Sequence, residues 1–132
     1  IQFNNANEAY YNALQDFINM PDIKQFTNSA EYYTTLFHEA IHSTGHKSRL
    51  NRKGITEPNK FGSIPYSMEE LIAEMGAAFL SAEAGINYGE IVENNAAYLQ
   101  GWLNKLKEDK RFIFKTAGRA QQAARYILGN NE

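Results

Sequence analysis

The sequence predicts a mainly helical domain, with at most a small β-sheet near its N-terminus. Length supports one domain with one modest core, because the chain has 132 residues. Composition supports a globular protein, with 43% apolar and 21% charged residues. Helical periodicity dominates the chain after residue 29. We therefore expect a single domain over residues 1–132.

The first twenty residues fit two different structures. Their apolar side chains form one helical stripe: Tyr10, Leu14, Phe17 and Ile18. The same stretch also fits two short strands, over residues 9–11 and 17–20, around a polar turn. Pro21 would end either element. The local pattern on its own favours the helix.

A helix over residues 30–44 is the clearest element of the chain. Ser29 is a suitable N-terminal cap, and Gly45 is suitable for the C-terminal end. A loop over residues 47–66 follows, with glycine and proline at four positions. A loop of this length is unusual inside a compact domain and is often functional.

Three further helices are predicted after this loop, over residues 67–85, about 90–107, and 110–128. Ser67 and Glu70 have the spacing of a capping box at the start of the first of them. In that arrangement, Glu69 would be a solvated acid in the first helical turn.

The stretch "FHEAIHSTGH", residues 37–46, contains every histidine of the chain. On a helix, His38 and His42 lie one above the other, so both imidazoles can bind one metal ion. Neutral imidazole is a good zinc ligand. Glu39 lies close enough to reach a metal-bound water. The H-E-x-x-H pattern therefore predicts two ligands and a general base on one helical turn.

The sequence leaves the third ligand open among His46, Glu70 and Glu74. On a continuous helix His46 would lie about 12 Å from His38, too far to share an ion easily. Gly45 could bend the chain to bring it back; otherwise His46 is a loop residue near the helix end.

Glu70 and Glu74 are four residues apart and share one helical face. A carboxylate in the middle of a helix, such as Glu74, needs a partner if it is buried. We expect Glu70 to be the ligand and Glu74 to orient a ligand histidine, with the opposite assignment as the alternative.

Composition excludes several classes of function. Without cysteine, the chain has no disulfide, no thiolate metal site and no cysteine nucleophile. No apolar run is long enough to span a bilayer, so we expect no membrane partner. The net charge of −2 indicates no particular partner. Seven basic residues within 105–125 raise the alternative of nucleic-acid contact.

Three stretches together resemble the C-terminal zincin-like metallopeptidase domain of ArdC-type antirestriction proteins, a family of mobile genetic elements. They are "YYTTLFHEAIHSTGHKSRLNR", "FGSIPYSMEELIAEMGAAFLSAEAGI" and "AAYLQGWLNKLKEDKRFIFKTAGRAQQAARYIL". The resemblance covers nearly the whole chain. It implies an α+β, mainly α fold, in which residues 9–20 form a β-hairpin whose edge strand lies over the active-site helix.

Carried over by position, the resemblance implies that His38 and His42 bind metal and that Glu39 is catalytic. Glu70 or Glu74 matches the acidic helix that supplies the remaining ligand. The expected function is a zinc-dependent metallopeptidase, with other divalent transition metals as alternatives to Zn²⁺. Glu39 would act as general base on a metal-activated water that attacks a peptide bond. Tyr66 and Tyr98 are the candidate donors to the oxyanion.

Two other functions compete with this one. The domain could be a non-catalytic zinc-bound module that inhibits restriction enzymes or assists single-stranded DNA binding. It could also be a zinc hydrolase that does not act on peptides. Relatives carry an N-terminal single-stranded-DNA-binding domain, and the start at Ile1 without methionine agrees with a C-terminal fragment. We expect a bacterial cytoplasmic protein with an unidentified protein or peptide substrate.

Overall fold

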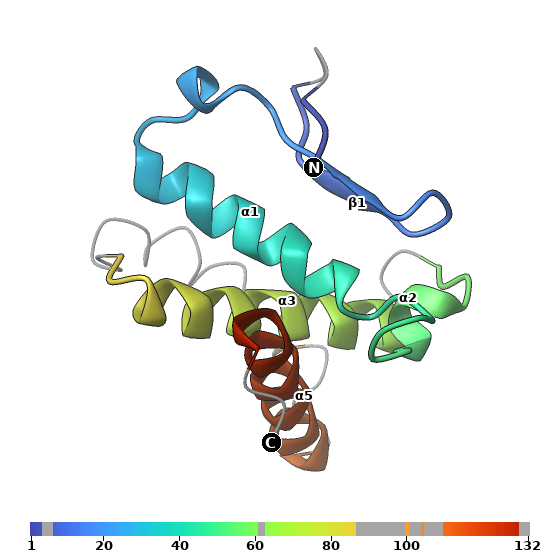
Figure 1. The fold of residues 1–132 in the computed structure, drawn as a ribbon. Helices are drawn as coiled ribbons and strands as arrows, with labels where there is room; N and C mark the ends of the chain where they lie inside the picture. Colours follow the sequence, from blue (N-terminus) through green and yellow to red (C-terminus); the bar gives the residue numbers. More distant parts are fainter. Residues whose placement is uncertain (4–6, 61–62, 87–99, 101–103, 105–109, 130–132) are drawn as a thin grey trace.

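The computed structural model describes residues 1–3, 7–60, 63–86, 100, 104 and 110–129. Its elements follow the chain in this order: β1 (Tyr10–Asn12), β2 (Phe17–Asn19), η1 (Ile23–Gln25), α1 (Ser29–Ser43), α2 (Lys53–Thr56), α3 (Ile64–Glu83) and α5 (Lys110–Leu128). Figure 1 shows α3 between α1 and α5, with the β-hairpin on the far side of α1. The predicted α+β, mainly α class is confirmed.

Residues 9–20 form the hairpin that the family resemblance implied, and the helix favoured by the local pattern is wrong. β1 and β2 pair antiparallel, with Tyr11 opposite Ile18. The Asn12 side chain accepts a hydrogen bond from the Gln15 amide at 2.9 Å, which closes the turn. Leu14 lies in this turn and is 98% exposed, so the helical stripe has no core to cover.

β1 is the edge strand of this small sheet. β2 lies between β1 and Gln2. The Gln2 amide donates to the Ile18 carbonyl at 2.7 Å, and the Met20 amide donates to the Gln2 carbonyl at 3.0 Å. Within the described part of the chain, no segment pairs with the outer edge of β1. This edge therefore offers backbone donors and acceptors beside α1 (Figure 1).

α1 begins one residue earlier than predicted. Asn28, rather than Ser29, is the cap, and its side chain accepts a hydrogen bond from the Glu31 amide at 2.8 Å. The Glu31 carboxylate in turn accepts from the Thr27 amide at 3.3 Å. These bonds fix the first turn of α1.

α3 begins at Ile64, and its cap, Ser63, lies four residues before the predicted cap, Ser67. Ser63 caps it by accepting a hydrogen bond from the Tyr66 amide, and Pro65 lies in the first turn. Ser67 is buried inside the helix, so the predicted capping box of Ser67 and Glu70 is wrong. Glu70 is consequently a mid-helix residue, and its carboxylate can contact α1.

The loop predicted over residues 47–66 is shorter than expected, because it contains α2 and the first turn of α3. α5 has its predicted bounds and ends before Gly129, which has a positive φ of 80°. The helix predicted over 90–107 falls outside the described residues except for Gln100 and Asn104, which are both helical. Tyr98 also falls outside them.

The core forms where α3 crosses α1 and α5. Its buried members are Ile41 of α1, Met68, Ile72, Ala73 and Leu80 of α3, and Ala120, Ala123 and Ala124 of α5. Alanines on α5 allow that helix to approach α3 closely. Gly76 has the same effect toward α1, since a Cβ there would lie 2.6 Å from the Cδ1 atom of Ile41.

Among the helices that the structure describes, none combines the length and apolar content that crossing a membrane requires.

The contact between Gly76 and Ile41 can be tested with alanine. Substitution Gly76→Ala should lower the free energy of unfolding by about 1 kcal/mol, because overpacking costs more than the gain in helix propensity. Gly118→Ala is the matched control: Gly118 is exposed on α5, and a Cβ there meets nothing within 4 Å. It should raise the same free energy by about 0.5–1 kcal/mol. Urea denaturation of the metal-free protein measures both, and a stabilising Gly76→Ala would contradict the tight crossing.

Candidate metal centre

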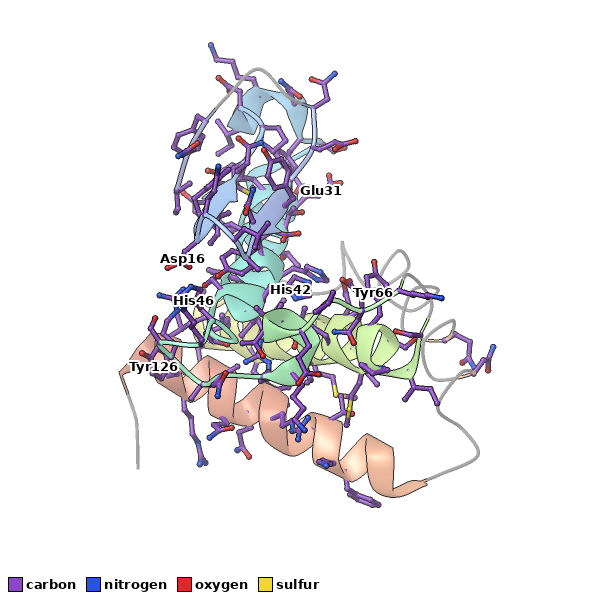
Figure 2. All side chains as sticks on the ribbon, turned by 90° about the vertical axis from the view of Figure 1, so that its right-hand side faces the viewer. Asp16, Glu31, His42, His46, Tyr66 and Tyr126 are labelled. Atoms are coloured by element: carbon purple, nitrogen blue, oxygen red, sulfur yellow. The ribbon has the colours of Figure 1, made fainter. Side chains whose placement is uncertain are left out.

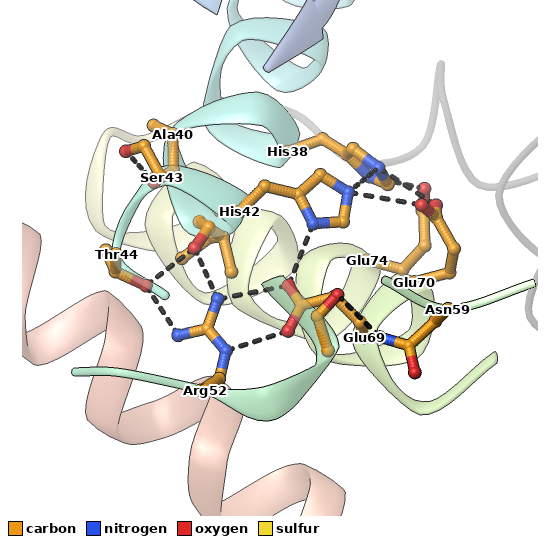
Figure 3. Close-up of polar contacts among 12 residues, drawn as sticks. His38, Ala40, His42, Ser43, Thr44, Arg52, Asn59, Glu69, Glu70 and Glu74 are labelled. Atoms are coloured by element: carbon orange, nitrogen blue, oxygen red, sulfur yellow. Dashed lines mark hydrogen bonds and ion pairs between the residues drawn. The ribbon is translucent and has the colours of Figure 1, made fainter. Parts of the chain in front are cut away.

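Two histidines of α1 face three glutamates of α3 across the helix crossing (Figure 3). His38 and His42 lie one turn apart on α1, and the side chain of His42 is 9% exposed. Glu69, Glu70 and Glu74 approach them from α3. The pattern of both helices predicts this meeting only in part, because the face of α3 that is buried depends on its packing against α1 and α5.

Three side chains converge on one point: His38, His42 and Glu70. The Nε2 atoms of the two histidines are 3.1 Å apart. Each is also 3.3 Å from a carboxylate oxygen of Glu70. In a tetrahedral zinc site with bonds of about 2.0–2.1 Å, neighbouring ligand atoms are about 3.3 Å apart. The spacing of these donors therefore fits a small divalent cation.

The Nδ1 atom of each histidine contacts a carboxylate. His38 Nδ1 lies 2.8 Å from Glu74 Oε1, and His42 Nδ1 lies 2.8 Å from Glu69 Oε2. A carboxylate can only accept here, so each Nδ1 carries a proton and donates it. In neutral imidazoles both Nε2 lone pairs then point at each other and at Glu70. Acceptors this close repel one another unless a proton or a cation lies between them.

The pKa values of these groups show that the site favours positive charge between the donors. Burial alone lowers the pKa of His38, but hydrogen bonds to Glu70 and Glu74 outweigh it and raise this pKa to about 9. For His42, bonds to Glu69 and Glu70 likewise overcome burial and raise the pKa to about 10. Burial raises the pKa of Glu70, yet the two histidines hold it well below its usual range. Without a bound ion, protons supply the positive charge.

Glu69 is the functional residue that the sequence reasoning missed. The prediction of a solvated first-turn acid is wrong, because Glu69 is 4% exposed and contacts both His42 and Arg52. Burial raises its pKa, but the bonds to these two partners lower it below the usual value. One signal could have identified it: Glu69 shares a helical face with Ile72, Ala73 and Gly76, all of which are buried.

A cleft of about 590 Å³ opens onto these donors. Its walls come mainly from β1, α1, α2 and α3, and they include Tyr10, Tyr11, Glu39 and Tyr66. Glu39, the predicted general base, thus lies in the same cleft as the donors. So does Tyr66, one of the two predicted oxyanion donors.

His46, the alternative ligand, does not join the cluster. Its Nδ1 atom accepts hydrogen bonds from the Ser48 hydroxyl at 2.8 Å and from the Ser48 amide at 3.1 Å. In Figure 2, His46 lies toward Asp16 of the hairpin turn, and Tyr66 lies on the other side of His42. His46 stabilises the turn that follows α1.

Comparison with known proteins places this architecture in a family. A family profile described as zincin-like metallopeptidase, MPTase-PolyVal, matches residues 1–119. The uncharacterized protein y4eC of Sinorhizobium fredii is 35% identical over 122 residues, which cover 92% of this chain and 38% of that protein. A DNA primase TraC of Escherichia coli is 38% identical over 128 residues, covering 97% of this chain and 12% of the primase.

Solved structures of the antirestriction ArdC protein from plasmid R388 are also similar, at 44% identity. The Mn(II)-bound structure has a TM-score of 0.79 and the match covers 98% of this chain and 47% of that one. The metal-free structure has a TM-score of 0.75 and a coverage of 98% and 45%. These matches confirm the resemblance to the ArdC-type domain. The chain spans less than half of each of these relatives.

Glu70, as a metal ligand, and Glu74, as the partner of a ligand, should lose different amounts of metal affinity when each is substituted. Glu70→Gln should weaken Zn²⁺ binding by more than about 100-fold, because it removes a charged donor atom. Glu74→Gln should weaken it by about 10–100-fold, since Glu74 acts through His38. His46→Ala is the control and should leave the affinity unchanged. Competition with a chromophoric chelator measures all three, and a larger loss in Glu74→Gln than in Glu70→Gln would reverse the assignment.

Metal binding should release protons. With pKa values of about 9 and about 10, His38 and His42 are both protonated at pH 7 in the metal-free protein. Each Nε2 must lose its proton to bind an ion, so about two protons leave per ion and the affinity rises with pH toward these values. Calorimetry at pH 7 in buffers of different ionisation enthalpy counts the protons. Release of fewer than one proton per ion would contradict this picture.

Proposed function

This chain belongs to the zincin-like metallopeptidase family, and on that premise we propose that it is a divalent-metal-dependent peptide hydrolase. One observation carries the proposal: two imidazoles and one carboxylate converge with the spacing of metal ligands, inside a cleft that Glu39 also lines. His38, His42 and Glu70 would hold the ion. Glu74 and Glu69 would orient the two histidines.

The donor set favours Zn²⁺, which prefers imidazole nitrogen and carboxylate oxygen. The similar ArdC protein binds Mn(II), and this supports a site that accepts other divalent metals as well. When bound, such a cation supplies Lewis acidity, which lowers the pKa of water and polarises a carbonyl group. All other steps fall to the side chains of this chain.

Glu39 is the proposed general base. It follows His38 on α1 and lines the same cleft as the three donors. Its carboxylate would accept the proton that water loses as the water oxygen attacks the carbonyl carbon. It would return this proton to the amine nitrogen as the C–N bond breaks, so that the acid and the base are one residue.

Tyr66 is the proposed donor to the negative charge that develops on the carbonyl oxygen. It lies in the first turn of α3 and lines the cleft. A phenol hydroxyl can donate one hydrogen bond to such an oxygen. Tyr98, the other candidate, falls outside the described residues and stays a prediction.

The edge strand β1 suggests how a substrate would bind. Tyr10 and Tyr11 of β1 line the cleft together with residues of α1 and α3. A peptide in extended conformation could pair with the outer edge of β1 and so pass over the metal-binding residues. We propose an unfolded or exposed protein segment as the substrate.

We also propose a biological setting, which the similarity to known relatives supports. Similarity to an antirestriction protein of a plasmid supports a role against host restriction, in the bacterial cytoplasm and within a longer polypeptide. Contact with single-stranded DNA would then belong to another part of that polypeptide. A non-catalytic inhibitor module and a hydrolase that does not cleave peptides remain the competing functions.

Substitution of the base separates catalysis from metal binding. Glu39→Gln should lower kcat for peptide cleavage by about 10²–10⁴-fold, because general-base catalysis is lost. Its Zn²⁺ affinity should stay at the wild-type value, since Glu39 is not a donor. A quenched fluorescent peptide library, assayed with Zn²⁺ and with Mn²⁺, measures cleavage, and a chelator-treated wild type provides the blank.

Two outcomes would contradict the proposal. Full cleavage by Glu39→Gln would exclude it as the base. A folded, metal-loaded wild type that cleaves no peptide in the library would favour the binding module.

A further inference from the structure

A buried arginine lies directly behind the candidate metal centre. Arg52 is 6% exposed and is the cap residue of α2, within the segment that the sequence predicted to be a loop. All of its guanidinium nitrogens are engaged (Figure 3). A buried charge is costly unless it is paired and hydrogen-bonded, so its placement requires a role.

Two of the four hydrogen bonds of the guanidinium group go to the C-terminal end of α1. Nη1 donates to the Thr44 hydroxyl at 2.7 Å, and Nη2 donates to the Ile41 carbonyl at 2.7 Å. The Ile41 carbonyl also accepts from the Thr44 amide at 3.1 Å and from the Thr44 hydroxyl at 2.6 Å, and a cation at the C-terminal end of a helix is favourable. This set of contacts would stabilise α1 whether or not a metal is bound.

The other two hydrogen bonds of the guanidinium group go to the Glu69 carboxylate. Arg52 Nε donates to Glu69 Oε1 at 2.8 Å, and Nη2 donates to Glu69 Oε2 at 3.0 Å. Two parallel bonds fix the plane of a carboxylate as well as its position. Oε2 is also the atom that lies 2.8 Å from His42 Nδ1. The guanidinium therefore fixes the oxygen that orients the imidazole.

Two glycines allow this close arrangement. A Cβ on Gly54 would lie 2.8 Å from Glu69 Cβ, and a Cβ on Gly45 would lie 3.0 Å from Arg52 Nη2. The backbone of α2 thus packs directly against Glu69, and the backbone that follows α1 packs directly against Arg52.

We propose that Arg52 is a positioning residue of the metal centre, which holds Glu69 so that His42 presents Nε2 to the ion. The inference rests on the proposed metal site. It makes the segment between α1 and α3 part of that site, although none of the residues described in this segment belongs to the donor cluster. The rival role is purely structural, through Thr44 and Ile41.

The two roles predict different effects on metal binding in the full chain. Arg52→Met should weaken Zn²⁺ and Co²⁺ binding by about 10–100-fold, the usual effect of losing a partner of a ligand. It should also alter the visible absorption of bound Co²⁺, because the His42 ring is no longer fixed. Arg52→Lys should recover part of the affinity, since it keeps the charge but loses the two parallel bonds. Thr44→Val, the matched control, should lower thermal stability and leave affinity and spectrum unchanged.

A double-mutant cycle sharpens the comparison. If Arg52 acts through Glu69, adding Arg52→Met to Glu69→Gln should weaken metal binding by much less than it does in the wild type. Added to Thr44→Val, it should weaken binding by its full single-mutant factor. Circular dichroism confirms that each variant is folded, and where Arg52→Met does not fold, Arg52→Lys replaces it in both cycles.

Wild-type affinity and an unchanged Co²⁺ spectrum in a folded Arg52 variant would overturn the inference. So would additive effects of Arg52 and Glu69 substitutions. A wild type that binds no divalent ion would remove both the metal site and the role of Arg52. A wild type that binds metal but cleaves no peptide would end the proposed hydrolase function alone, because none of these measurements uses peptide cleavage.

Discussion

The structure depends on the pairing of two imidazoles of α1 with three carboxylates of α3. His42 and Glu69 are buried, and His38, Glu70 and Glu74 are half-buried. Charged groups cannot be removed from water at this crossing unless each finds a partner. His38 has Glu74 and Glu70, and His42 has Glu69 and Glu70. Gly76 brings the two helices close enough for these contacts. The fold and the site are therefore one arrangement: the helix crossing orients the donors, and the donors neutralise one another across it.

Local sequence was sufficient for the part of the site that lies on one helix. His38, Glu39 and His42 follow from helical periodicity alone, and the placement of Glu70 near both histidines agrees with the expected spacing. The hairpin could not be predicted in this way. Its strands are three residues long, and their pairing with each other and with Gln2 competes with an equally good helical stripe. Only the family resemblance favoured the strands.

Glu69 and Arg52 show where such reasoning fails. A helix that began at Ser67 would have Glu69 in its solvated first turn. α3 instead begins after the cap Ser63, so Glu69 lies in the second turn, where it is buried. Arg52 carries no local signal, because its partner Glu69 lies 17 residues away, across a segment with no clear periodicity. The contacts of Arg52 depend on tertiary packing, and the local sequence carries no trace of them.

The short edge strand has a consequence for how selectively such a site can work. β1 has three residues, so an extended ligand can form only a few main-chain bonds with it, each worth about 0.5–1.5 kcal/mol net. In the proposed hydrolase, binding of a free peptide at this edge would then be weak. Efficient cleavage would require a target held nearby by other contacts, which raise its effective concentration at the cleft. A weak edge would thus restrict the proposed activity to tethered targets.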